Sequence, residues 1–231
     1  AGIAVVVALA GAAFTVPDLG VRIRKRPALL DTLRAMRDRR LLAIGGLNFS
    51  IGFTAGGMVL STLTLLVKSH GVVVFGRDVQ GSAGLLMAWM TIVDALVTPF
   101  AGRLGDRGHA HARVGAAAML LLVAGLAAIG LTTTTIGLAC GLALIGLGTA
   151  GLGPSLLVLL GELVPLDRRG TGVGIMQLCG DAGGMLGPLV GTALFAGSSS
   201  LPYLATAGFV TCFIPVALWL AHLERRATVP L

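Results

Sequence analysis

Long apolar runs alternate with short polar segments along most of this chain. Six of the runs are long enough to cross the hydrocarbon core of a bilayer, for which a helix needs roughly 20 mostly apolar residues. We therefore predict an all-α membrane protein, built as a bundle of six transmembrane helices. The predicted spans are residues 41–67, 81–102, 114–131, 136–160, 171–197 and 202–222.

The composition excludes a soluble globular domain. Of the 231 residues, 55% are hydrophobic and only 12% are charged, whereas soluble domains carry about 25% charged residues. Glycine is abundant, with 35 residues, as expected where helices approach one another closely in lipid. The lipid bilayer is therefore the first partner that the sequence predicts.

The basic residues are concentrated in alternate loops between the predicted spans. Of the 17 lysines and arginines, only Lys68 and Arg77 fall on the opposite side. Because cytoplasmic loops are enriched in basic residues, we expect segment 17–40 and the tail 223–231 to be cytoplasmic. Topology thus explains the net charge of +7, and we exclude nucleic-acid binding. The arginine-rich, glycine-rich composition favours a multi-pass protein of a bacterial inner (plasma) membrane.

The chain starts without methionine, and residues 1–16 are apolar from the first position. A signal peptide would place basic residues before its apolar core. We therefore interpret residues 1–16 as the end of a preceding transmembrane helix, and the chain as a fragment. Segment 17–40 is either a solvated basic linker or a short amphipathic helix on the inner leaflet, because Leu29, Leu33 and Met36 recur at helical spacing.

Two acids, Asp94 and Asp181, lie deep inside predicted spans. At ~1.5 Å per helical residue, both lie roughly 12–15 Å from the cytoplasmic ends of their spans. Charges inside a membrane are costly and indicate function by default. We predict a shared polar site for protons or substrate, which Gln177 joins because it lies one helical turn before Asp181. The alternative is that each acid is a hydrogen-bonded packing element.

The first predicted span carries hydroxyl groups on one face, at Ser50, Thr54 and Ser61. One interpretation is a mildly polar wall of a substrate cavity. The other is that these hydroxyls hydrogen-bond back to the carbonyl groups of their own helix.

The fifth predicted span contains a stripe of small residues. Small residues at helical spacing allow another helix backbone to approach closely, and a proline permits a bend because it lacks a backbone donor. We predict a helix-packing motif made of Gly174, Gly183, Gly187, Pro188 and Gly191.

A compact charged hairpin joins the second and third predicted spans. It places one acid among three arginines, between helices that are otherwise nearly free of charge. We predict a gate at the cytoplasmic side of the membrane. Its residues are Gly102, Arg103, Gly105, Asp106, Arg107 and Arg113.

This hairpin resembles the Gly-x-Leu-(Ala/Gly)-Asp-Arg motif of the major facilitator superfamily. The resemblance implies that residues 41–222 are the C-terminal half of a twelve-helix transporter, whose N-terminal half is a partner absent from this chain. It also implies alternating access, in which two bundles rock about a central site. Asp106 would accept hydrogen bonds from a helix N-terminus of the opposite half, and the arginines would pair with nearby acids.

The glycine and proline pattern of the fifth span is similar to the antiporter motif of the same family, with Thr192 in place of its closing glycine. We therefore expect a secondary transporter that exports small molecules in exchange for protons. Uptake by proton symport remains an alternative, as does a membrane-embedded binding or scaffold protein that does not transport.

We expect no enzymatic activity, cofactor or metal. An intramembrane aspartyl protease also uses two buried acids, but its motifs would require tyrosine in place of Val93 and glycine in place of Leu178. The three cysteines are scattered and show no paired spacing that would indicate a metal site or a disulfide framework.

Overall fold

The computed structural model describes residues 38–107, 110–166 and 168–227, and these residues form helices and connecting turns without a β-strand. Long apolar segments become helices in lipid because only a helix satisfies all of its own backbone groups there. The helices are α3 (Arg39–Ile51), η1 (Gly52–Val59), α4 (Leu60–His70), α5 (Val79–Asp106), α6 (His111–Leu131), α7 (Thr135–Leu163), α8 (Arg169–Phe195), α9 (Leu201–Thr211) and α10 (Ile214–Ala227).

The six predicted spans are confirmed. Six helical segments are long and apolar enough to cross a membrane. The first is the continuous run α3–η1–α4 and the last is α9 followed by α10, while α5, α6, α7 and α8 each form one span. The expected segments 1–16 and 17–40 lie outside the described residues, apart from residues 38–40. Helix α10 continues to Ala227 and so extends into the expected tail 223–231.

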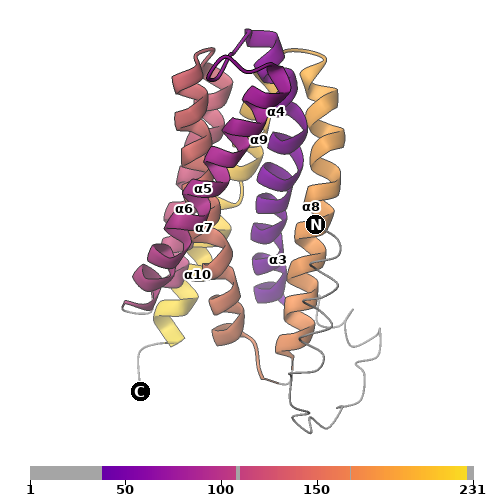
Figure 1. Ribbon diagram of the computed structural model, residues 1–231. Coiled ribbons are helices and arrows are strands. Elements are labelled where there is room, and N and C mark those ends of the chain that lie inside the picture. Colours follow the sequence, from indigo (N-terminus) through magenta and orange to yellow (C-terminus); the bar gives the residue numbers. More distant parts are fainter. Residues whose placement is uncertain (1–37, 108–109, 167, 228–231) are drawn as a thin grey trace, which may run out of the picture.

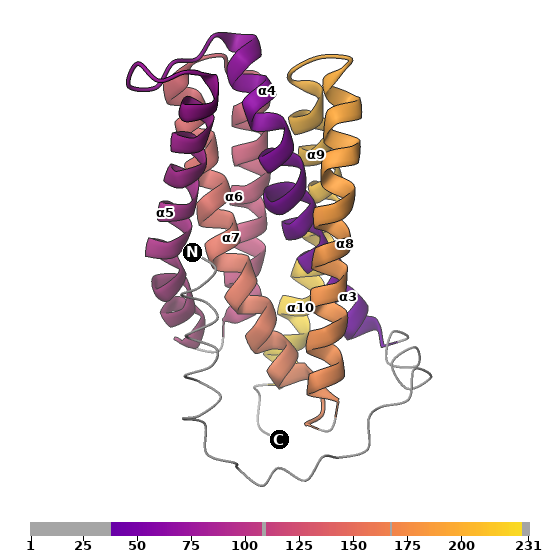
Figure 2. The same ribbon diagram turned by 45° about the vertical axis from the view of Figure 1, so that its right-hand side comes forward.

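The spans are arranged as an open bundle (Figure 1). Figure 2 shows α5 and α8 at opposite sides with α6, α7 and α4 between them, while α3 emerges beside the lower part of α8. Helix α5 packs on α7, and α8 packs on α3 and η1. Helix α6 packs on α7, and α9 and α10 pack on α6, which places these three helices on the other side of the bundle.

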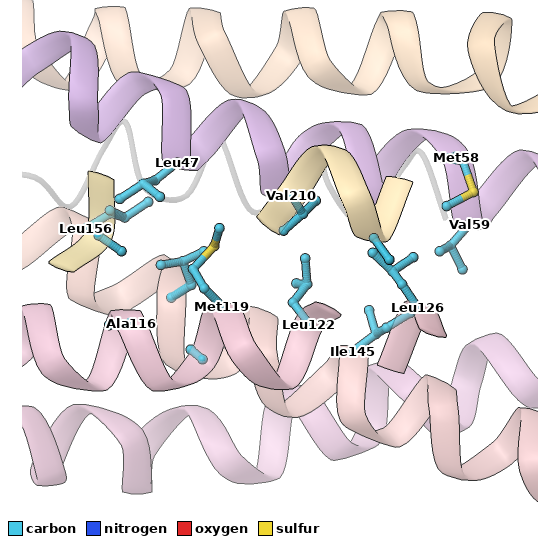
Figure 3. Packing of buried hydrophobic residues seen from close by; sticks show 14 of the residues in the cluster. Leu47, Met58, Val59, Ala116, Met119, Leu122, Leu126, Ile145, Leu156 and Val210 are labelled. Carbon is cyan, nitrogen blue, oxygen red and sulfur yellow. The ribbon is translucent and has the colours of Figure 1, made fainter. Parts of the chain in front are cut away.

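The buried core lies where α3, η1, α6, α7 and α9 meet (Figure 3). Because lipid tails are as apolar as leucine, helices in a membrane are held together by close packing and hydrogen bonds more than by the hydrophobic effect. The largest fully buried side chains include Leu47, Met58, Met119, Leu122 and Leu126. A buried hydrogen bond of 2.9 Å from Thr62 Oγ1 to the Tyr203 hydroxyl links α4 to α9.

The first span contains a π-helix, η1, which the apolar pattern does not predict. A π-helix widens the helical turn and is uncommon outside functional or strained sites. It lies where α8 comes closest, because a Cβ built on Gly57 would meet the Gly187 Cα at 2.8 Å. Glycines on both helices permit this backbone contact.

The last span is interrupted between α9 and α10, where a single helix over 202–222 is predicted. The amides of Cys212 and Phe213 bond three residues back, to the carbonyls of Phe209 and Val210. Pro215 has no N–H for the carbonyl of Thr211, so the regular ladder cannot continue through this point. The interruption leaves space beside α3, between α3 and α10.

Candidate functional site

Two polar stripes border one face of the bundle. On α5, Asp94 and Thr98 lie one helical turn apart on one side of the helix, and a Cβ built on Gly146 of α7 would lie 3.4 Å from Asp94 N. On α8, Leu186 and Val190 line a groove shared with α9. Gln177 and Asp181 lie on the opposite side of α8. Of the six spans, α5 and α8 are the least buried within the bundle, and we call the surface between them the open face.

Asp94 is half-buried at the contact between α5 and α7. The Thr98 hydroxyl lies 3.3 Å from Asp94 Oδ1 and also donates to the Asp94 carbonyl at 2.8 Å. Thr149 of α7 donates its hydroxyl to the carbonyls of Ile145 and Gly146, at 3.2 and 3.0 Å. The helices approach closely here, since a Cβ on Gly146 would lie 2.7 Å from the Met90 carbonyl oxygen. Asp94 is thus partly buried where α5 meets α7.

Asp181 is exposed, and its Oδ1 accepts a 3.0 Å hydrogen bond from Gln177 Nε2. Gly56 of η1 and Gly153 of α7 have no atom within 4 Å of a built Cβ among the described residues. A side chain at either position would therefore meet no described neighbour.

The two acids predicted to share a polar site lie on different spans. Asp94 lies on α5, which packs on α7, while Asp181 lies on α8, which packs on α3 and η1. No hydrogen bond or ion pair joins the two acids in the described part of the chain. One molecule that contacts both acids would therefore have to bridge α5 and α8.

The cavity-wall interpretation is wrong for Ser50 and Thr54, because both side chains are fully buried in the bundle. Ser50 Oγ donates to the Leu47 carbonyl at 2.7 Å, and Ser61 Oγ, which is half-buried, donates to the Met58 carbonyl at 3.0 Å. The alternative, hydroxyls bonded back to their own helix, describes these two serines. Thr54 Oγ1 is buried without a hydrogen-bond partner among the described residues.

The small-residue stripe of α8 lies against α3 and η1. A Cβ on Gly183 would collide with the Phe49 carbonyl oxygen. One on Gly187 would lie 2.6 Å from both Gly57 Cα and Met58 N, which is also a steric clash. Gly191 approaches Met58 Cγ in the same way, at 3.0 Å. Gly174 differs from the expectation, because no described atom lies within 4 Å of its built Cβ.

The charged hairpin consists mainly of two helix ends, which corrects the expectation of a tight loop. Residues 102–106 form the last turn of α5, and α6 begins at His111. Gly105 is buried directly under the His111 ring, where a side chain would collide with the ring nitrogen. His111 Nε2 lies 3.3 Å from Asp106 Oδ1. Glycine is therefore required at position 105 for the helix ends to meet.

The remaining charges of this hairpin point outward. Asp106 has a side-chain exposure of 72% despite its contact with His111. Arg103, Arg107 and Arg113 are exposed, and none forms an ion pair with a residue that the structure describes. The hairpin therefore presents both signs of charge to whatever lies next to it.

Sequence reasoning missed three residues that organise this end of the bundle. Glu224 of α10 is buried, and its carboxylate accepts the Ala112 amide at 3.1 and 3.3 Å. Arg40 Nη1 and Arg169 Nε donate to the carbonyls of Leu163 and Val164, at 3.4 and 3.3 Å, where α7 ends. An acid near a helix N-terminus and cations near a C-terminus both complement the helix dipole. The signal was present for Glu224, as an acid bordering an apolar span.

The family follows from a comparison with known proteins. The sequence model of the Major Facilitator Superfamily matches residues 75–230. The multidrug resistance protein MdtG of Serratia proteamaculans (strain 568) is 24% identical over 190 residues, which are 78% of this chain and 44% of that relative. This chain therefore spans less than half the length of the curated relative. With six membrane-crossing helices and the family match over most of its length, the chain belongs to the major facilitator superfamily of membrane transporters.

Proposed function

We propose that this chain is the C-terminal half of a proton-coupled exporter that works by alternating access. The observation that carries the proposal is that Asp94 and Asp181 lie on α5 and α8, the two spans that are least buried within the bundle. An uncovered polar face inside a membrane requires a partner, because lipid cannot satisfy carboxylates. The second half of the transporter is that partner, and the substrate binds between the two halves.

Proton coupling is proposed for Asp94 and Asp181. Among the described residues, the Thr98 hydroxyl lies 3.3 Å from the Asp94 carboxyl group and the Gln177 amide donates to that of Asp181 at 3.0 Å. Neither acid is neutralised by an ion pair with a described residue. Protonation would remove a negative charge from the open face. It would therefore shift the equilibrium between the two conformations of the alternating-access cycle.

Export is favoured over uptake by two observations. MdtG is named as a multidrug resistance protein, and the glycine and proline spacing of α8 is similar to the antiporter motif. The charged hairpin would act as a latch on the cytoplasmic side, with exposed Asp106 facing a helix N-terminus of the other half. The basic end of the bundle, which carries Arg103, Arg107 and Arg113, is then cytoplasmic.

A flux assay tests this proposal. The full-length protein would be reconstituted in vesicles with ethidium as the probe and an imposed pH gradient. Antiport drives ethidium into vesicles that are acidic inside, whereas symport drives it into vesicles that are acidic outside. We expect the double variant Asp94→Asn, Asp181→Asn to lose gradient-driven flux down to the level of empty vesicles.

Asp78→Asn is the matched control, because it removes a carboxylate outside the open face. Asp78 is the N-cap of α5 and accepts the Gly81 amide, and asparagine caps helices about as well as aspartate. Unchanged flux in the double variant would contradict proton coupling. Absence of flux in every gradient, with the wild-type protein folded, would favour the non-transporting scaffold.

A further inference from the structure

A groove opens between α3 and α10 at the end of the bundle where the described arginines cluster. It has a volume of about 530 Å³, which is within the range of roughly 300–1,000 Å³ typical of ligand pockets. At ~1.5 Å per residue, the stretch of α3 that lines it spans roughly 10 Å along the helix. The lining residues are Arg39, Leu42, Ala43, Gly46, Phe213, Pro215, Val216 and Trp219.

The groove exists because two features leave space unfilled. Pro215 interrupts the last span, so Phe213 lies in the break between α9 and α10. Gly46 has no side chain, and a Cβ there would already lie 3.1 Å from the Phe213 ring. The break at Pro215 and the missing side chain at Gly46 therefore leave a groove between α3 and α10.

The groove is separate from the open face. On the other edge of α3, Asn48 donates a 2.8 Å hydrogen bond to the Met176 carbonyl of α8, whereas Gly46 faces α10 through Phe213. Deeper in the membrane, the ring of Phe213 lies 5.2 Å from that of Phe209. Phe209 also lines a second apolar groove of about 320 Å³, between α8 and α9. The apolar surface thus continues toward the membrane interior.

One end of the groove is charged. Arg39 is the first residue of α3 and is exposed, and it forms no ion pair with a described residue. Trp219 lies at the same end and is 40% exposed. Tryptophan favours the headgroup level of a membrane, and basic residues near the surface attract anionic lipids.

We propose that this groove binds an anionic phospholipid. One acyl chain lies along Ala43, Gly46 and Val216, and the phosphate of the headgroup pairs with Arg39. Charge complementarity identifies the occupant: Arg39 is the one basic residue among the described lining residues, it forms no ion pair with a described residue, and the rest of this lining is apolar. A free phosphate would leave the apolar lining unused, and a neutral lipid would leave Arg39 unpaired.

Lipid retention tests the proposal without using transport as a readout. The full-length protein would be placed in nanodiscs of phosphatidylcholine with a minor share of phosphatidylglycerol. After extraction in mild detergent, native mass spectrometry would count the lipids that remain bound. We expect Arg39→Gln to lower phosphatidylglycerol retention about fivefold, the effect of one basic residue near an anionic surface. Arg39→Lys should retain most of the binding.

Val216→Phe fills the groove and should also lower retention. The matched controls are Arg77→Gln, at the other membrane surface, and Leu120→Phe, at an exposed position of α6. Size-exclusion chromatography would establish that each variant is folded. The proposal is overturned if Arg39→Gln retains as much phosphatidylglycerol as Arg77→Gln. It is equally overturned if phosphatidylcholine is retained as well as phosphatidylglycerol, or if Val216→Phe has no more effect than Leu120→Phe.

Discussion

Single side chains join helix ends that are far apart in the sequence. Glu224 lies 112 residues after Ala112 in the sequence, yet its carboxylate accepts a hydrogen bond from the Ala112 amide in the first turn of α6. A few residues away, His111 covers Gly105 and reaches Asp106. The charged hairpin is therefore held from two sides, by α5 and by α10, while its arginines remain available to a partner.

Replacing Glu224 tests this contact. We expect Glu224→Ala to lower the free energy of unfolding by about 1–3 kcal/mol, because a buried backbone donor loses its acceptor. Glu224→Gln keeps an acceptor oxygen and should cost less. Thermal unfolding of the purified protein in detergent measures the difference. Asp181→Ala, which removes an exposed carboxylate, is the control; an equal loss there would show that the Ala112 contact is not the cause.

At the scale of elements, the contact of α8 with α3 and η1 depends on the absence of side chains. Glycines lie on both sides of it, so backbone meets backbone along several turns. Such contacts give strong packing in lipid. They also leave no interlocking side chains to prevent one helix from sliding along the other, which suits a transporter that must change shape.

Two glycines of α8 allow the effect of helix packing on stability to be distinguished from the effect of helix propensity. In Gly187→Ala the new methyl group would meet backbone atoms of Gly57 and Met58 at 2.6 Å, and overpacking of this kind costs about 1–3 kcal/mol. Gly174→Ala adds the same group into open space, where alanine favours the helix over glycine by up to ~1 kcal/mol. Thermal unfolding should therefore shift down for the first variant and slightly up for the second. Shifts of the same sign would contradict the packing role.

At the scale of the whole molecule, the open face makes this chain one part of a larger assembly. Helices α5 and α8 border that face and contribute few residues to the buried core. Their outward surfaces are apolar with a few acids and hydroxyls, which is a surface for a second bundle and a solute rather than for lipid alone.

Cysteine labelling tests whether water reaches this face. In a full-length protein without native cysteines, a cysteine at Thr98 should react with a membrane-impermeant thiol reagent added from the basic side. A cysteine at Leu120, which is exposed on α6 away from the open face, should react much more slowly, because thiols in lipid are not ionised. Adding ethidium should change the rate at Thr98 only. Equal rates at both positions would contradict alternating access through the open face.

Much of the architecture was predictable because it depends on local sequence patterns. The lengths of the apolar runs determine the number of spans, and both the Asp106 motif and the α8 glycines are recognisable as short patterns. The π-helix at Gly52–Val59 was not predicted, because hydropathy is continuous through it. The helix break at Pro215 was not predicted either, although proline is a local signal. Proline alone does not mark a break, since Pro99, Pro154 and Pro188 lie inside unbroken helices.

The sequence by itself determined six membrane spans, a basic side and membership of a transporter family. Only the tertiary structure decided which faces meet: Ser50 and Thr54 are buried, Asp94 and Asp181 border one open face without touching, and Glu224 holds α6. The physical reason is that these helices are apolar almost all round, so no local periodicity marks an inner face. Which face of a helix is buried is determined by the shape of the neighbouring helices and by the glycines that let them approach closely.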